Sequence, residues 1–205
     1  MRYLTLIREW RARVNLTGVD VRASPAALVA GALCALPFLP GAGRLVDLGS
    51  GAGVPGIPIA ILRPGLRVLL ADAARRKTAF LELAVRELAL ANADVAQARA
   101  EDLGRAPAHR EAYDAVTAQA LAPLRVLAEY ALPLVRLGGV AVLPKGAAAE
   151  DELRDAARAL SILGAEAELY PARAAVCTPI VVLRKVAPVP PEYPRRAGVP
   201  ARHPL

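Results

Sequence analysis

The chain contains 205 residues, of which 55% are hydrophobic and 22% are charged. This balance excludes an intrinsically disordered protein, and the length allows one well-buried domain with modest additions. The formal net charge is +7, which favours a polyanionic partner over a neutral metabolite.

Two helices are predicted before residue 44. Apolar residues recur at helical spacing over residues 3–14 with arginines mostly between them, which is the pattern of an amphipathic helix. Ser24 and Pro25 suit the N-cap and first position of a second helix over residues 26–36. Residues 26–43 carry no charge, but prolines interrupt them, so we expect a buried helix and turn rather than a membrane anchor or signal sequence.

From residue 44 onward, short β-rich runs alternate with longer helical runs, which is typical of parallel βα units. The predicted strands cover residues 45–48, 67–71, 95–98, 113–119 and 140–143. The predicted helices cover residues 54–62, 75–90, 124–137 and 150–163. Residues 166–170 and 180–185 are expected to pair as an antiparallel hairpin. The expected fold class is α/β, a mostly parallel doubly wound sheet with a C-terminal antiparallel hairpin and a short N-terminal helical extension.

The C-terminal segment 188–205 is rich in proline and arginine. Its prolines predict neither a helix nor a central strand. We expect either an extended arm packed on the domain or a tail that contacts phosphates. The expected organisation is a helical extension over residues 1–43, a cofactor-binding domain over residues 44–187 and this tail over residues 188–205.

The strongest functional signal lies in residues 45–56, where an apolar strand ends in Asp47 and runs into closely spaced glycines. Gly49, Gly51 and Gly53 permit positive φ angles and leave no Cβ, so the backbone can lie against a ligand. A strand, a glycine loop and a helix form the first unit of a doubly wound sheet. The segment therefore predicts a nucleotide-type cofactor site.

Two cofactors compete for this loop. Residues 51–56 also match a dinucleotide fingerprint, and Asp72 follows about 20 residues later, as that fingerprint requires. However, an anion at Asp47 would repel a pyrophosphate and attract the ammonium and sulfonium groups of S-adenosylmethionine. S-adenosylmethionine is therefore the favoured cofactor, and a dinucleotide is the alternative.

The carboxyl ends of the other strands supply further candidates, because ligands of open parallel sheets lie outside these ends. Asp72 would accept hydrogen bonds from ribose hydroxyls. Ala100 and Glu101 would meet the adenine, and Gln119 follows the fourth strand. No catalytic residue is predicted, because no general base is recognisable; this favours methyl transfer to a nitrogen with a free lone pair, such as guanine N7, through positioning.

Neither the cysteines nor the histidines indicate a metal site. Cys34 and Cys177 are far apart in apolar surroundings, and we expect buried thiols in a reducing compartment. His109 lies in a polar loop and His203 near the C-terminus, so no set of metal ligands is predicted.

Several motifs together resemble the GidB/RsmG family over nearly the whole chain. They are Asn-Leu-Thr at residues 15–17, the glycine loop at 47–58, Arg-Ala-Glu at 99–101, Leu-Ala-Pro-Leu at 121–124, Lys-Gly at 145–146 and the tail at 193–200. The Tyr-Pro-Arg-Arg of the tail and the Gly-x-Pro-Gly-x-Pro of the loop are far more specific than a lone glycine motif. This family comprises bacterial methyltransferases that modify guanine N7 in small-subunit ribosomal RNA.

The resemblance implies a Rossmann-like class I methyltransferase fold, S-adenosylmethionine as cofactor, and methylation of a guanine in 16S ribosomal RNA (rRNA). We expect a cytoplasmic monomer whose partner is small-subunit rRNA or the assembling subunit, and no membrane partner. The expected cofactor contacts are Asp47, Gly49, Gly51, Gly53, Val54, Asp72, Ala73, Ala74, Ala100, Glu101 and Gln119. The expected RNA contacts are Asn15, Arg99, Lys145, Arg195 and Arg196.

The chain departs from the family pattern at several positions. Gly31, Cys34 and Ala35 lie where the family usually has a histidine followed by Asp-Ser. Gln119 stands in place of an arginine, and Val54 in place of a common phenylalanine. Three other hypotheses therefore stay open: a noncatalytic or weakly active rRNA-binding homologue, a methyltransferase for a small molecule or protein, and a nicotinamide oxidoreductase.

Overall fold

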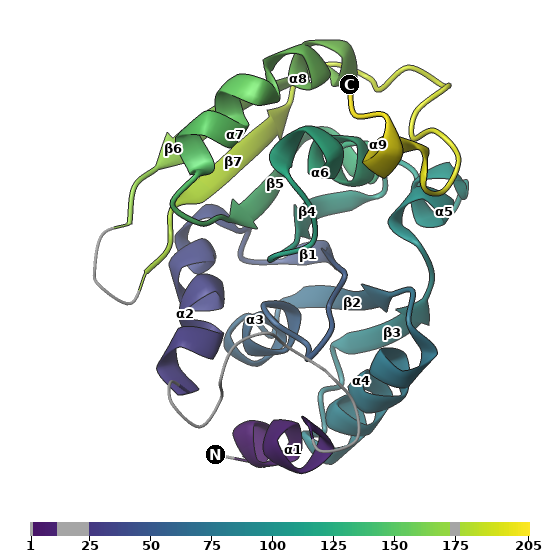
Figure 1. Cartoon of the computed structure of the whole chain (residues 1–205). Helices are drawn as coiled ribbons and strands as arrows, with labels where there is room; N and C mark the ends of the chain where they lie inside the picture. The colour runs from purple at the N-terminus through teal and green to yellow at the C-terminus, as the bar shows by residue number, and fades with distance from the viewer. Residues whose placement is uncertain (1, 12–24, 173–176) are drawn as a thin grey trace.

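A computed structural model describes residues 2–11, 25–172 and 177–205, and Figure 1 shows helices packed around a central sheet. Within these residues the sheet has seven strands in the order β3-β2-β1-β4-β5-β7-β6. The strands are β1 (Gly43–Leu48), β2 (Leu66–Asp72), β3 (Ala93–Gln97), β4 (Tyr113–Thr117), β5 (Val135–Pro144), β6 (Ala165–Tyr170) and β7 (Ile180–Lys185). The first five pair in parallel, whereas β7 is antiparallel to both β5 and β6. The predicted α/β class, the doubly wound sheet and the C-terminal hairpin are therefore confirmed.

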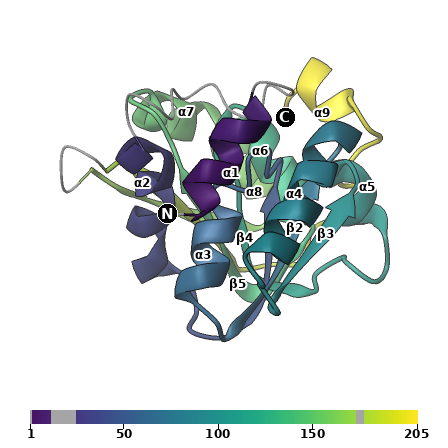
Figure 2. The same cartoon turned by 90° about the horizontal axis from the view of Figure 1, so that it is seen from below.

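The helices cover both faces of this sheet (Figure 2). They are α1 (Arg2–Arg11), α2 (Pro25–Ala35), the 3-10 helix η1 (Leu36–Phe38), α3 (Gly56–Leu62), α4 (Arg75–Glu87), α5 (Ala100–Arg105), α6 (Leu124–Ala131), α7 (Ala149–Asp155), α8 (Ala157–Leu163) and α9 (Val199–Arg202). Side chains of α1 to α4, such as Phe80, pack in one apolar cluster, and those of α5, α6 and α8, such as Leu124, pack in another. In β1, Leu45 belongs to the first cluster and Val46 to the second, as the two-residue period of a strand requires.

The N-terminal predictions are confirmed where the structure describes the chain. The helix predicted over residues 3–14 corresponds to α1, and the end of that prediction, with the turn after it, lies outside the described residues. The uncharged segment 26–43 forms α2 and η1 and then leads into β1. Among the described residues, none of the helices has both the length and the apolar character that crossing a bilayer requires.

Two predicted helices end or break earlier than the sequence pattern indicates. The helix predicted over residues 124–137 ends at Ala131, and β5 begins at Val135, because Pro133 prevents the helix from continuing. Leu134 and Val135 are fully buried, and their apolar character had matched a helical face equally well. The helix predicted over residues 150–163 is divided at Ala156 into α7 and α8.

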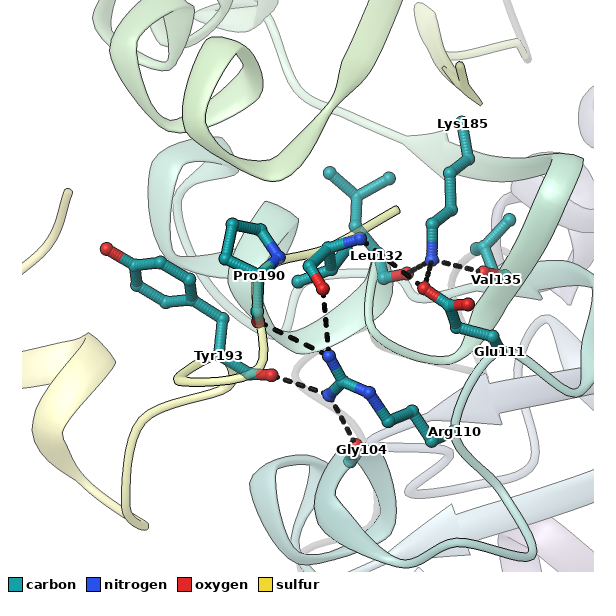
Figure 3. Close-up of polar contacts among 9 residues, drawn as sticks. Gly104, Arg110, Glu111, Leu132, Val135, Lys185, Pro190 and Tyr193 are labelled. Carbon is teal, nitrogen blue, oxygen red and sulfur yellow. Dashed lines mark hydrogen bonds and ion pairs between the residues drawn. The ribbon is translucent and has the colours of Figure 1, made fainter. Parts of the chain in front are cut away.

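The C-terminal tail packs on the domain, where Arg110 holds its backbone carbonyl groups (Figure 3). The guanidinium donates to the carbonyl oxygens of Val189 and Tyr193 at 3.0 and 2.6 Å. The prediction that the tail contains no helix is wrong, because α9 spans Val199–Arg202. Pro200 lies in the first turn of this short helix, where the missing N–H has no partner to lose.

Lys185 lies beside the tail and is fully buried at the end of β7. Its ammonium donates to Glu111 Oε1 at 2.6 Å and to the carbonyl oxygens of Leu132 and Val135 at 3.1 and 2.8 Å (Figure 3). Burial lowers the pKa of Lys185, and the ion pair with Glu111 opposes that shift. One buried cation thus joins the end of β7 to the junction between α6 and β5.

The prediction of two free thiols is wrong, because Cys34 and Cys177 form a disulfide with Cα atoms 6.0 Å apart. The bridge joins α2 to the segment that precedes β7. Its partners are separated by 143 residues, and only the arrangement of α2 beside the antiparallel hairpin brings them together.

We expect reduction of this disulfide to lower the stability of the fold. For a closed loop of this length, the chain-entropy relation gives at most about 5 kcal/mol of stabilisation. Thermal unfolding of the oxidised protein, the reduced protein and the double variant Cys34→Ser, Cys177→Ser measures the effect. Three equal melting temperatures would contradict the expectation.

Candidate active site

The glycine loop follows β1 and adopts a backbone that only glycine accepts without strain. Gly49, Gly51 and Gly53 have φ angles of 65°, 56° and 84°. A Cβ at Gly49 would lie 2.6 Å from Leu121 Cδ1, and one at Gly53 would lie 2.4 Å from Ile57 Cδ1. The backbone conformation therefore favours glycine at all three positions, and at Gly49 and Gly53 a Cβ would also displace a neighbouring side chain.

Two acidic residues hold this loop through its backbone N–H groups. Asp47 Oδ2 accepts a hydrogen bond from the Gly56 amide at 3.0 Å, and Asp72 Oδ2 accepts one from the Gly51 amide at 3.0 Å. Asp72 Oδ1 also accepts from the Ala74 amide at 2.9 Å, and Lys77 Nζ lies 3.7 Å from Oδ2. The ends of β1 and β2 are thus joined to the loop and to the start of α4.

Asp47 is fully buried beneath the loop, and its Oδ1 atom has no hydrogen-bond partner. Burial raises the pKa of Asp47 from 3.8 to about 7, although the Gly56 amide opposes the shift, and the nearby Asp72 adds to it. Tyr3 of α1 donates its hydroxyl to the Ala52 carbonyl at 2.8 Å, so the loop is also held from the side of α1.

A cavity of about 400 Å³ opens where the loop, the end of β2 and the start of α5 meet. Its lining residues are Leu48, Gly49, Ala71, Asp72, Ala73, Lys77, Ala98, Arg99, Ala100, Glu101, Ala120, Leu121, Tyr130, Gly198 and Ala201. We call it the donor cavity. It brings together five predicted cofactor contacts, namely Gly49, Asp72, Ala73, Ala100 and Glu101.

The other predicted cofactor contacts lie around the donor cavity and are not among its lining residues. Asp47, Gly51, Gly53, Val54 and Ala74 belong to the loop and its supports. Their roles at a cofactor stay predictions.

The C-terminal tail completes the donor cavity, a feature that the sequence analysis missed. Gly198 and Ala201 contribute to its wall, and the Gly198 amide donates to Glu101 Oε1 at 2.8 Å. Arg195 anchors this part of the tail through hydrogen bonds from its side chain to both carboxylate oxygens of Glu129. Glu101 and Gly198 are 97 positions apart, so no local pattern could have revealed the contact.

A second cavity of about 540 Å³ adjoins the first, and Ala120 and Leu121 line both. We call it the acceptor cavity; it is lined by Gln119, Ala120, Leu121, Ala122, Pro123, Pro144, Lys145, Gly146, Glu152 and Thr178. Gln119, predicted as a cofactor contact, lies here, and its cofactor role stays a prediction. Lys145 Nζ donates to Glu152 Oε2 at 2.6 Å and to the Ala122 carbonyl at 3.1 Å, so the two charges neutralise each other.

The structure places the predicted RNA contacts on different elements. Arg99 lines the donor cavity, Lys145 lines the acceptor cavity, and Arg195 is engaged by Glu129. Arg196 is exposed on the tail. Asn15 lies outside the described residues.

In the described ranges, no group of three or more histidine, cysteine or acidic side chains is arranged to hold a metal ion.

Comparisons with known proteins agree on one family. A family model described as rRNA small subunit methyltransferase G (GidB) matches residues 1–181. The ribosomal RNA small subunit methyltransferase G of Roseiflexus castenholzii is 44% identical over 209 residues, which cover 100% of this chain and 89% of the relative. The protein of the same name from Desulfitobacterium hafniense is 39% identical over 211 residues, with coverage of 99% and 87%.

Solved structures are similar at the level of the fold. A SAM-dependent methyltransferase from Aquifex aeolicus has a TM-score of 0.60 at 15% identity and covers 80% of this chain and 93% of its own. Precorrin-6y C5,15-methyltransferase from Geobacter metallireducens has a TM-score of 0.56 at 18% identity, with coverage of 76% and 87%. The fold is therefore Rossmann-like and shared with S-adenosylmethionine-dependent methyltransferases.

We expect the substitution Asp47→Asn to change how stability depends on pH. In the folded protein the Asp47 pKa is about 7, against an ordinary value of 3.8, so the unfolded chain loses this proton first as the pH rises. Between about pH 4 and about pH 7 the wild type should therefore lose about 1.4 kcal/mol per pH unit relative to the variant, whose amide does not titrate. Chemical denaturation of both proteins across this range measures the difference, and a pH-independent difference would contradict the assignment.

Proposed function

The chain belongs to the GidB family, rRNA small subunit methyltransferase G, and we propose that it transfers a methyl group from S-adenosylmethionine to N7 of a guanine in small-subunit (16S) rRNA. The observation that carries the chemical part of this proposal is the pair of adjoining cavities. One is built on a glycine loop braced by acidic side chains, and the other meets it along Ala120 and Leu121. A methyl donor in the first can therefore face an acceptor in the second.

The residues of the donor cavity fit S-adenosylmethionine. Gly49 leaves no Cβ between the backbone and a ligand, and acceptor oxygens are supplied by Asp72 at the end of β2 and by Glu101 in the first turn of α5. Asp47 is buried beneath the same loop, and in its ionised form it would favour a sulfonium and an ammonium group over a diphosphate. When bound, S-adenosylmethionine supplies an electrophilic methyl group attached to sulfur.

We propose a distribution of roles among these residues. Gly49, Ala73, Ala100 and Glu101 would hold the cofactor directly, and Asp72 would share its carboxylate between the loop and the ribose. Asp47, Gly51, Gly53, Val54 and Ala74 would act by fixing the loop. The division into residues 1–43, 44–187 and 188–205 is part of this proposal, with the last segment closing the donor cavity.

Chemistry at guanine N7 needs no residue that removes a proton, because N7 carries a free lone pair. Lys145 and Glu152 of the acceptor cavity form an ion pair with each other. The reaction does not require either of them to act as a base. The contribution of the protein is then to align N7 with the methyl group and to exclude water, and such positioning can account for most of the rate.

The partner and the location follow from the same proposal. We propose that the protein acts in the cytoplasm as a monomer on small-subunit rRNA or the assembling subunit. The names of the relatives and the formal net charge of +7 support an rRNA partner. Arg99 beside the donor cavity and the exposed Arg196 are the predicted cationic contacts that the structure leaves most open to phosphates.

The direct test is methylation of rRNA by the purified protein. Unmethylated 16S rRNA and small ribosomal subunits are incubated with S-adenosylmethionine, digested, and examined by mass spectrometry. The expected product is a single N7-methylguanosine in one of the two substrates. RNA binding without any methylated nucleoside would instead support the noncatalytic homologue, and methyl incorporation at another base would refute the N7 assignment.

We expect Gly49→Ala to weaken S-adenosylmethionine binding by about tenfold or more. The left-handed backbone costs a residue with a Cβ about 1–2 kcal/mol, and the new atom would press on Leu121 at the cavity wall. Gly41→Ala is the matched control, because a Cβ there meets no atom within 4 Å. Calorimetric titration compares the affinities, and equal values for all three proteins would remove the loop from the cofactor site.

A further inference from the structure

Among the described residues, buried side-chain atoms without a hydrogen-bond partner gather at the acceptor cavity. In the part of the chain that the structure describes, the buried side-chain atoms without a hydrogen-bond partner are Asp47 Oδ1, Gln119 Oε1 and Thr178 Oγ1. Gln119 and Thr178 both line the acceptor cavity. A buried polar atom without a partner costs about 1–3 kcal/mol. Such atoms in a native protein call for an explanation, and a bound ligand is one.

The sheet topology brings these two side chains to the same edge. Gln119 follows β4, whose neighbour β1 marks the point where the strand order reverses, which is where open α/β sheets bind ligands. Thr178 precedes β7, and because β7 is antiparallel to β5, its first residue pairs with Pro144 at the carboxyl end of β5. The Lys145 amide, which donates to the Pro179 carbonyl at 2.8 Å, holds this arrangement.

Helix α2 positions both groups. A Cβ at Gly31 would lie 2.5 Å from Gln119 Oε1, so the missing side chain is what makes room for the amide. Cys34, three residues further along α2, is bonded to Cys177, the neighbour of Thr178. Both side chains are therefore held at the cavity wall by α2, and their oxygen atoms stay covered until a ligand draws them toward the cavity.

The chemistry of the cavity selects a neutral, flat, hydrogen-bonding ligand. Its cation and anion, Lys145 and Glu152, are paired, so the cavity offers no free charge to a phosphate. Leu121 and Pro144 supply apolar walls for the faces of a ring. An amide and a hydroxyl can each donate and accept hydrogen bonds, and guanine presents a carbonyl acceptor beside two N–H donor groups.

We propose that the acceptor cavity binds the target guanine and that Gln119 and Thr178 recognise its polar edge; this inference rests on the proposed function. The two side chains hold the base by hydrogen bonds while N7 faces the donor cavity across Ala120 and Leu121. They determine specificity for the base and take no part in binding S-adenosylmethionine.

The test uses the full chain with the nearly isosteric substitutions Gln119→Met and Thr178→Val. Each should lower kcat/KM for rRNA methylation about tenfold, and affinity for S-adenosylmethionine should stay within about twofold of the wild type. The melting temperature should stay equal or rise, because each substitution removes an unpartnered buried polar atom. Thr178→Ser, which keeps the hydroxyl, and Gln97→Met, on the exposed end of β3, should both behave as the wild type.

Three results would overturn the proposal. Wild-type kinetics in both variants would show that neither group contacts the base. A loss of S-adenosylmethionine affinity in Gln119→Met would make that residue a cofactor contact instead. A fall in melting temperature that matches the fall in activity would make the role structural.

If the proposed function is wrong, the wild-type protein will not methylate rRNA, and this result is distinct from the three above. In that case, guanosine binding tests the assignment of the acceptor cavity without requiring methylation. Saturation-transfer NMR on the protein loaded with S-adenosylhomocysteine should detect guanosine with the wild type and not with the double variant Gln119→Met, Thr178→Val. Equal signals from both proteins would refute the assignment of the cavity.

Discussion

The site depends on two carboxylates that hold a glycine loop by its backbone N–H groups. Asp72 ties the Gly51 amide to the end of β2, and Asp47 ties the Gly56 amide to the end of β1. These bonds satisfy donors that would otherwise be buried without partners, and they fix the loop before a cofactor arrives. The cost is visible at Asp47, where burial raises the pKa to about 7. At a pKa near 7 this carboxyl is largely protonated below neutral pH, and a positively charged ligand close to the loop would favour its ionised form.

The tail places a second constraint on the same cavity from the opposite end of the chain. Arg195 is held by Glu129, and Gly198 is held by Glu101, so the last residues of the chain form part of the donor cavity wall. Two arginines of the tail therefore differ in their surroundings. Arg195 is occupied in closing the cavity, whereas Arg196 stays exposed. A segment predicted to contact phosphates thus also forms part of the donor cavity wall.

The sequence predicts well whatever depends on neighbouring residues. Strand, glycine loop and helix follow one another within residues 45–62, and the two-residue and helical periods mark most of the sheet and its crossovers. Prediction failed where distant segments decide the outcome. The pairing of Cys34 with Cys177, the burial of Lys185 against the α6–β5 junction and the contact of Gly198 with Glu101 all join residues more than 45 positions apart. The predicted helix over residues 124–137 was also too long, because its apolar run continues past Pro133 into β5.

The two cavities differ in the charged groups on their walls. The donor cavity holds charges of both signs, with Asp72 and Glu101 on its wall beside Lys77 and Arg99. Lys145 is the one cation among the described residues that line the acceptor cavity, and it is paired with Glu152, so a base can enter without meeting an unpaired charge. Attraction of the polyanionic RNA would then come from exposed arginines such as Arg99 on the wall of the donor cavity and Arg196 on the tail, where salt screens it. On this proposal, affinity for the RNA backbone and recognition of the base are assigned to different residues, and a change in one need not alter the other.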